Sequence, residues 1–235
     1  MSLDSPEDVA HEAISELVFK GNPLGKSIIG TRSSLNRITR NVLIDYYENE
    51  YSRDNMVIAI TGKFDEQAVC EYFDDKFLDL KAKKPTKDIE ILPYKKSYKV
   101  IVKDIEQTHI CLATKGLKLD DDRRYAFAIL NNIMGGSMSS RLFQNIREEK
   151  GLAYSVYSMK NSFKDDGYYN IYAGVSHDKI KDALEGIKEE LVLLEKNGIT
   201  KEELETSKEQ LKGNYIFSQE SVAGRMFTIG KDITL

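Results

Sequence analysis

Two segments in which apolar and polar side chains alternate constrain the fold more than any other feature. They are AYSVYSMKNSF at residues 153–163 and GYYNIYAGVS at 167–176, and the turn-forming residues KDDG connect them. Successive side chains of a strand point to opposite faces, so two such runs across a short turn predict an antiparallel hairpin. A hairpin accompanied by helices grouped in blocks is typical of an α+β fold and not of a parallel doubly wound sheet.

Helical patterns dominate the first 80 residues. Apolar residues recur at helical spacing in residues 6–19 and again in 65–80. Three residues are predicted N-caps of helices in this region: Ser5, Thr31 and Thr39. Residues 56–60, MVIAI, are short, apolar and β-branched, so they predict a single buried strand among these helices.

A segment rich in lysine, residues 81–96, separates this region from the rest. It holds six lysines and two of the four prolines of the chain, which is the composition of a linker. Beyond it, the predicted elements are strands at 97–105 and 108–117, helices at 122–134 and 139–151, the hairpin, and charged helices at 177–197 and 201–219.

Charge and hydropathy exclude several classes of partner. The 235 residues include 34 Lys and Arg against 38 Asp and Glu, a net charge of −4, which argues against nucleic acid or an anionic membrane as a main partner. No apolar run approaches the ~20 residues that span a bilayer, and the acidic N-terminus lacks the apolar segment of a signal peptide. We therefore expect a cytoplasmic protein in which Cys70 and Cys111 are buried free thiols.

Complete metal-binding and nucleophile motifs are absent from the sequence. His11-Glu12 begins a His-Glu-x-x-His pattern, but Ser15 stands where the second histidine is needed, and the inverted form His-x-x-Glu-His does not occur. Patterns of the Cys-x-x-Cys, Walker A, Gly-x-Gly-x-x-Gly and Gly-x-Ser-x-Gly types are also missing. No metal ligand is therefore assigned, and His11, His109 and His177 are interpreted as structural.

Arg147 and Tyr154 are the candidate catalytic residues. Arg147 falls in the last turn of a predicted helix and Tyr154 just inside the next strand, with Gly151 between them to reverse the backbone. A guanidinium and a phenol placed in this way can both donate to one peptide carbonyl or oxyanion. The alternative is structural: Arg147 neutralises helix-end carbonyls and nearby acids, and Tyr154 belongs to the core.

Gly135, Gly136 and Ser137 precede this pair, and we assign them to substrate binding. Their structural alternative is a helix C-cap and turn. A phosphate cradle is disfavoured because no Lys or Ser/Thr follows at the spacing of a P-loop.

Residues 130–158, LNNIMGGSMSSRLFQNIREEKGLAYSVYS, closely resemble the second domain of the insulinase–pitrilysin class of zinc metallopeptidases, and most closely its bacterial processing-peptidase branch. Residues 22–65 resemble the later half of that family's first domain, with Arg53 where the family commonly has Pro. The resemblance extends over nearly the whole chain from Ser5. It implies two similar layered α+β domains, with antiparallel-rich sheets covered by helices, that face each other around a chamber.

The resemblance also implies a zinc-dependent endopeptidase that acts on peptides or unfolded segments. In the family, the first domain carries His-x-x-Glu-His, which binds zinc and supplies the general base, and a Glu further along completes the ligands. The substrate adds as a β-strand to a sheet edge. The second domain lends an Arg and a Tyr that contact the substrate, and these match Arg147 and Tyr154.

The chain departs from the family pattern because the zinc motif is missing. We expect residues 1–80 to be the later half of the zinc-bearing domain, 81–96 the linker, and 97–235 a second domain shortened at its C-terminus. Such a fragment is expected to be inactive alone and to hold no zinc, and the resemblance implies that the parent protein binds zinc. Two alternatives stay open: a non-catalytic scaffold or partner subunit of the same fold, and a free-standing peptide-binding module.

A truncated first domain is also expected to expose apolar faces. Residues 5–80 would then either pack against the second domain in a way foreign to the family or promote self-association of the chain.

Overall fold

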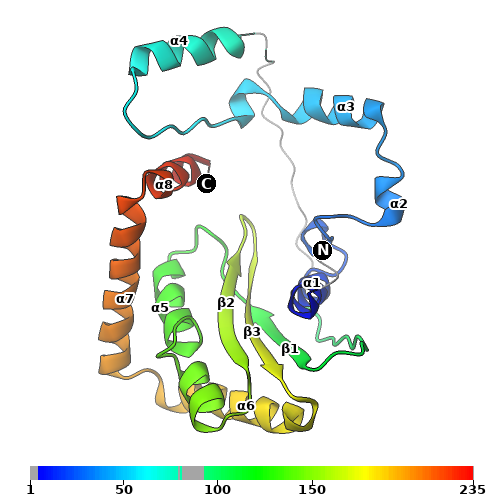
Figure 1. Ribbon diagram of the computed structural model, residues 1–235, viewed down its shortest axis with the longest axis vertical. Coiled ribbons are helices and arrows are strands. Elements are labelled where there is room, and N and C mark those ends of the chain that lie inside the picture. The colour runs from blue at the N-terminus through cyan, green and yellow to red at the C-terminus, as the bar shows by residue number, and fades with distance from the viewer. Residues whose placement is uncertain (1–4, 79, 81–92, 235) are drawn as a thin grey trace. The chain divides into compact units, whose positions relative to one another are not determined.

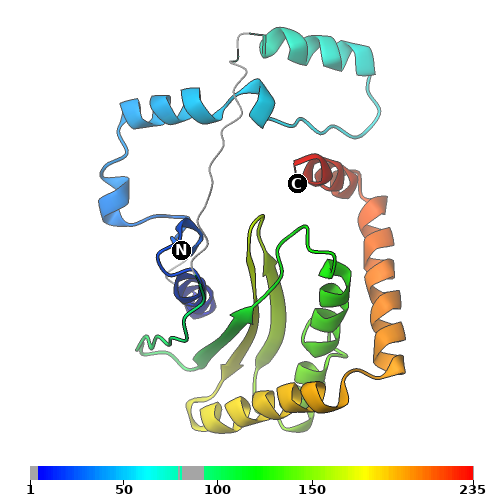
Figure 2. The same ribbon diagram turned by 180° about the vertical axis from the view of Figure 1, so that it is seen from behind.

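The computed structural model describes residues 5–78, 80 and 93–234 (Figures 1 and 2). Two compact units interleave along the sequence: the first is Met1–Ser27 with Ile89–Lys212, and the second is Ile28–Asp88 with Gly213–Leu235. These units reflect contacts and not the domains of a family, so the predicted division into 1–80, 81–96 and 97–235 stays a prediction. Most of the predicted linker, residues 81–92, lies outside the described residues.

A three-stranded antiparallel sheet forms the centre of the first unit (Figure 1). Its strands are β1 (Thr108–Lys115), β2 (Ser155–Ser162) and β3 (Gly167–Val175), in the spatial order β1-β3-β2. β3 pairs antiparallel with both neighbours. The predicted hairpin and the predicted α+β class are therefore confirmed.

Three helices cover one face of this sheet: α5 (Arg124–Met134), a π-helix termed η3 (Phe143–Glu149) and α6 (Ile180–Asn197). A 3₁₀ turn, η4 (His177–Lys179), precedes α6, and α7 (Lys201–Glu220) follows it. Burial of apolar surface holds these layers together. The hydrophobic core consists of Met134, Leu142, Ile146, Ala153, Val156, Tyr169, Ile171, Ala173, Val175, Ala183 and Ile187.

The helix α1 (Pro6–Val18) covers the other face and lies along β1 (Figures 1 and 2). Its predicted N-cap is confirmed, because Ser5 Oγ accepts from the Asp8 N–H at 3.2 Å. Phe19 ends the helix, is 4% exposed, and packs edge-to-face on Tyr168. β3 is buried along its whole length because its alternate side chains face these two covers.

The second unit is helical in its described part. A 3₁₀ turn of the first unit, η1 (Pro23–Gly25), precedes it along the chain. In chain order, the second unit contains α2 (Arg32–Leu35), α3 (Arg40–Glu50), the 3₁₀ turn η2 (Arg53–Asn55), α4 (Glu66–Lys76), the end of α7, and α8 (Val222–Thr234). The predicted caps Thr31 and Thr39 are confirmed, since their hydroxyl oxygens accept from the N–H groups of Ser34 and Val42 at 3.1 and 3.4 Å.

Two predicted strands do not form. Residues 56–60 and 97–105 have no strand pairing in the described structure. In the second segment, Tyr98, Val100 and Val102 are 89%, 76% and 91% exposed. A strand is stabilised by a neighbouring backbone and by side chains across the ladder, and not by its own apolar pattern. Both predictions are wrong because neither segment pairs with another strand within the described ranges.

The two cysteines are free thiols, but only one of them is partly buried. Cys70 on α4 is exposed, which contradicts the prediction of a buried thiol, because the described residues place no core beside α4. Cys111 on β1 is intermediate, and burial raises its pKa to about 12.

Among the helices of the described ranges, none combines the length and the apolar character that crossing a membrane requires.

Candidate functional site

The turn after α5 brings Gly135, one of the predicted substrate-binding residues, against β2. The N–H groups of Gly135 and Gly136 donate to the Asn131 carbonyl at 3.0 and 2.9 Å and so end the helix. The Gly135 carbonyl accepts from the Ser158 N–H at 3.1 Å. A Cβ on Gly135 would lie 2.4 Å from that nitrogen, so only glycine fits. A helix C-cap therefore accounts for this position.

Gly136 and Ser137 continue the turn toward solvent. A Cβ on Gly136 would lie 2.9 Å from Asn132 Cα, yet the residue itself is exposed. Ser137 Oγ lies 3.4 Å from the Asn132 carbonyl oxygen and 3.2 Å from Ser139 Oγ. The exposed backbone at Gly136 is thus the part of this turn that a ligand can approach.

Arg147 lies on the π-helix η3, immediately after a residue that anchors this helix in the core. The Lys150 N–H donates to the Asn145 carbonyl at 3.2 Å, which is the i→i−5 spacing of a π-helix. Leu142 and Ile146 are fully buried on the inner side. Arg147 follows Ile146 on the exposed side of the helix.

Within the described residues, the Arg147 guanidinium makes only a long ion pair, with the carboxylate of Glu148. Its side chain is 44% exposed, its Nε lies 3.8 Å from Glu148 Oε1, and its Cζ lies 4.7 Å from the centre of the Phe143 ring. Arg123 and Arg141, by contrast, each donate to a carboxylate through two nitrogens. Within the described chain Arg147 also makes no hydrogen bond to a helix-end carbonyl. Its donor fork is therefore available to a ligand.

Tyr154 is the residue before β2 and is 61% exposed. Its N–H donates to the Gly174 carbonyl at 2.8 Å, which fixes its backbone to the sheet. Its hydroxyl has no hydrogen-bond partner among the residues that the structure describes. The alternative in which Tyr154 belongs to the core is therefore wrong.

The structure places Arg147 and Tyr154 near either end of the short connection between η3 and β2. Gly151 lies between them with a φ of +56°, a left-handed conformation that glycine adopts without strain. In the described structure no hydrogen bond joins the two side chains. Their convergence on one ligand stays a prediction.

Sequence patterns missed a partly buried polar cluster between α1 and the sheet. His11 Nε2 lies 2.8 Å from the Tyr157 hydroxyl, which donates to the Glu7 carboxylate. The His11 ring also stacks on Tyr172, with ring centres 5.2 Å apart. Burial lowers the pKa of His11, and the carboxylates of Glu7 and Asp8 oppose this shift without cancelling it. The cluster therefore favours a neutral imidazole.

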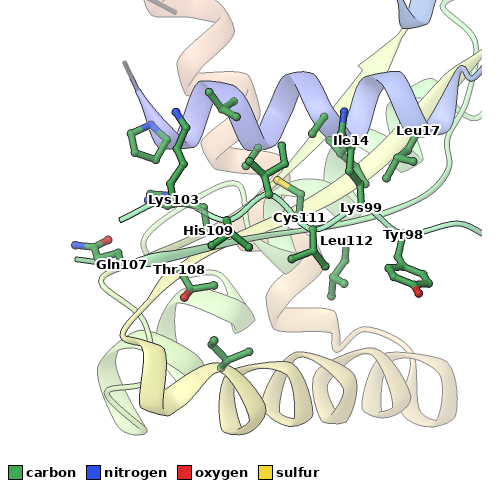
Figure 3. A pocket seen from close by; sticks show the side chains of 18 of the residues that line it. Ile14, Leu17, Tyr98, Lys99, Lys103, Gln107, Thr108, His109, Cys111 and Leu112 are labelled. Carbon is green, nitrogen blue, oxygen red and sulfur yellow. The ribbon is translucent and has the colours of Figure 1, made fainter. Parts of the chain in front are cut away.

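A cavity of about 610 Å³ lies beside this cluster, between α1, β1 and residues 97–103 (Figure 3). Ile14 and Leu17 of α1 line it, and His109 and Cys111 lie on its β1 side. His109 Nδ1 lies 2.7 Å from the Tyr172 hydroxyl. The cavity is mainly apolar and contains none of the predicted site residues.

Zinc does not fit the residues that the structure describes. No three His, Cys, Asp or Glu side chains in residues 5–78, 80 and 93–234 are placed to hold a metal ion. His11 and His109 contact tyrosines, and His177 Nδ1 lies 2.7 Å from Thr108 Oγ1. This part of the chain therefore offers no group through which a zinc-dependent step can be written.

The sequence matches the model of a known protein family. The family model described as "Peptidase M16 inactive domain" matches residues 37–211. The uncharacterized zinc protease YmxG of Bacillus subtilis is 38% identical over 99% of this chain and 56% of its own length. The uncharacterized zinc protease SCO5738 of Streptomyces coelicolor is 33% identical over 98% of this chain and 52% of its own length. The chain thus spans about half the length of the curated relatives that it matches.

Solved structures share the fold. The peptidase M16 inactive domain from Pseudomonas fluorescens gives a TM-score of 0.88 at 24% identity, over 98% of this chain and 55% of the other. A protease from Helicobacter pylori gives 0.84 at 21% identity, over 99% and 58%. A chain of complex III₂ from Candida albicans gives 0.81 at 19% identity, over 99% and 58%. Identities this low support a common fold and nothing finer.

Proposed function

This chain belongs to the peptidase M16 family, and we propose that it is part of a zinc-dependent endopeptidase that cleaves peptides or unfolded segments. The relatives named as zinc proteases support this proposal. In it, zinc and its ligands belong to the part of the protein outside this chain. The chain supplies contacts to the substrate and is inactive alone.

One observation carries the proposal: the side chains of Arg147 and Tyr154 are both exposed, and neither has a strong partner in the described structure. Backbone hydrogen bonds hold both residues in place. A guanidinium stays charged and donates from a rigid fork. A tyrosine hydroxyl donates to a carbonyl or to the oxyanion that develops from it. We propose that Arg147 donates to the backbone of the substrate and that Tyr154 donates to the developing oxyanion.

We further propose that the turn at Gly135, Gly136 and Ser137 contacts the substrate. Packing against Ser158 explains Gly135 by itself, so the contact is assigned to the exposed backbone of Gly136 and to its neighbour Ser137. A close approach of two backbones needs the small side chains found here.

The test uses the full-length protein that contains this chain. Arg147→Ala and Tyr154→Phe should each lower kcat by about 10²–10³, the loss typical of one oxyanion donor, while zinc content is unchanged. Arg123→Ala and Tyr125→Phe are matched controls, because both side chains are exposed in the same unit and the proposal gives them no contact. Unchanged rates in both site variants would overturn the proposal.

A second candidate is a non-catalytic scaffold or partner subunit. The fold is compatible with it, because a chain of the Candida albicans complex III₂ shares this fold. The full-length protein would then lack bound zinc and peptidase activity. Zinc analysis together with a peptide cleavage assay separates the two candidates.

We also propose a cytoplasmic location and peptide substrates, without nucleic acid or a membrane as partner. The net charge of −4 supports this, since a nucleic-acid-binding surface is strongly basic. Recovery of the full-length protein in the membrane fraction would contradict it.

A further inference from the structure

The helix that carries Arg147 is of an uncommon type. η3 has π-helical geometry over seven residues, Phe143–Glu149. A π-helix is rare, and it occurs mostly as a short insertion within an α-helix, frequently at a functional site. Each of its turns holds more residues than an α-turn, because its hydrogen bonds close at i→i−5 in place of i→i−4. Contacts from outside the helix are therefore needed to stabilise it.

The helix α6 supplies these contacts. A Cβ on Gly186 would lie 2.7 Å from Ile146 Cδ1, so the missing side chain lets α6 approach the π-helix closely. Next along α6, the Glu190 carboxylate accepts from Asn145 Nδ2 at 2.6 Å. Lys179 Nζ donates to the Gly151 carbonyl at 2.8 Å, just beyond the end of η3.

Glu190 stands out because it interrupts the apolar face of α6. Its neighbours on that face, Ala183, Gly186 and Ile187, are buried, and Glu190 itself is only 5% exposed. Burying a carboxylate costs free energy unless hydrogen bonds compensate it. A residue that breaks the local pattern in this way points to a role other than packing.

We propose that Asn145 and Glu190 are a positioning pair that holds the π-helical turn and so sets the direction of the Arg147 side chain. This inference rests on the proposed function, in which Arg147 contacts the substrate. Neither member of the pair touches the substrate in this proposal.

The geometry explains how the pair acts through Arg147. Asn145 is two residues before Arg147, and its carbonyl accepts the Lys150 N–H that closes the π-turn. If the segment reverted to an α-helix, Arg147 would rotate relative to the anchor Leu142 by about one residue, or roughly 100°. A displacement of this size separates a donor from its acceptor, and a shift of about 1 Å can already lower a rate by 10².

The competing explanation is that the hydrogen bond between Asn145 and Glu190 is purely structural, and the chain offers a matched control. Lys150 and Glu189 join the same two helices at 2.7 Å, but both side chains are about half exposed, at 41% and 54%. Surface pairs of this kind contribute little. Glu189→Gln should therefore leave activity and local structure unchanged.

The experiment exchanges donor and acceptor in the full-length protein. Asn145→Asp removes the amide donor and places a second carboxyl group against that of Glu190, and should lower kcat/KM by up to about 10². Adding Glu190→Gln restores one hydrogen bond, in which the new amide at position 190 donates to the new carboxylate at position 145. The double variant should recover most of the lost kcat/KM. In an Arg147→Ala background, Asn145→Asp should have no further effect, because the pair acts only through Arg147.

Hydrogen exchange provides a readout that does not depend on activity. In Asn145→Asp the amides of Lys150 and Leu152, which bond to the carbonyls of Asn145 and Ile146, should exchange about tenfold faster, and the double variant should restore them. Unchanged exchange, or an equal loss of kcat/KM in both backgrounds, would overturn the inference. If Arg147→Ala alone keeps the wild-type rate, the proposed function fails, and the exchange result still decides whether the pair holds the turn.

Discussion

At the scale of single residues, His11 lies where α1 packs against the sheet and contacts Tyr157 and Tyr172. Its ring stacks on those of Tyr157 and Tyr172, with ring centres 6.0 and 5.2 Å away, and the two tyrosine rings stack on each other at 4.8 Å. Burial lowers its pKa below the ordinary value of 6.5, against the opposing effect of the Glu7 and Asp8 carboxylates. The unfolded chain therefore binds more protons than the folded chain in the window just below pH 6.5. The contribution of His11 to the free energy of unfolding is fully present above this window and is lost as the pH falls through it.

We therefore predict that the free energy of unfolding falls on acidification below the ordinary pKa of histidine, and that His11→Gln reduces this slope by up to about one proton. Urea denaturation at a series of pH values measures it. His109 keeps part of the slope, because burial lowers its pKa as well. His177→Gln is the control, since this exposed side chain bonds to Thr108 and lies outside the cluster. A slope in His11→Gln equal to that of the wild type would contradict the prediction.

At the scale of elements, the junction of α5 with β2 depends on a missing side chain. A Cβ on Gly135 would lie 2.4 Å from the Ser158 nitrogen, whereas a Cβ on Gly213 of α7 would meet nothing within 4 Å. We predict that Gly135→Ala lowers the free energy of unfolding by about 1–3 kcal/mol through overpacking. Gly213→Ala should raise it by about 0.5–1 kcal/mol, because alanine loses less conformational entropy in a helix. Urea denaturation of both variants measures the difference, and a Gly135→Ala protein as stable as the wild type would argue against the close approach.

The elements that could be predicted from sequence are those with local signals. The caps at Ser5, Thr31 and Thr39 form because a side chain bonds a backbone group three residues away. The hairpin of β2 and β3 forms because its partner strand is only a turn away. Residues 56–60 and 97–105 have strand-like sequences, but pairing depends on distant chain that a local pattern does not describe.

The candidate site shows the same limit. Exposure of Arg147 and Tyr154 agrees with roles read from their residue types and spacing. The π-helical geometry of η3 could not be predicted, because apolar periodicity in residues 139–151 does not separate i→i−4 from i→i−5 bonding. The role of Glu190 could not be predicted either, because its partner Asn145 lies 45 positions away and only the fold brings them together.

At the scale of the whole molecule, the hydrophobic core is unevenly shared. Every buried hydrophobic side chain of the described chain belongs to the first unit. In the second unit, Phe217 at the end of α7 is 69% exposed, and Phe227 and Ile233 of α8 are 72% and 65% exposed. Exposed apolar surface of this extent favours association. The self-association expected from the sequence should therefore use the second unit.

We predict that this chain associates as its concentration rises, and that the double substitution Phe227→Lys with Ile233→Lys shifts it toward monomer, because two charges must be desolvated to keep the contact. Sedimentation velocity over a range of concentrations measures the shift. Tyr125→Lys with Met138→Lys is the matched control: these residues are also exposed, at 68% and 77%, but lie in the first unit. If only the α8 double variant dissociates, the surface through which the chains associate lies on the second unit. A wild-type monomer at every concentration, or equal dissociation in the control, would contradict it.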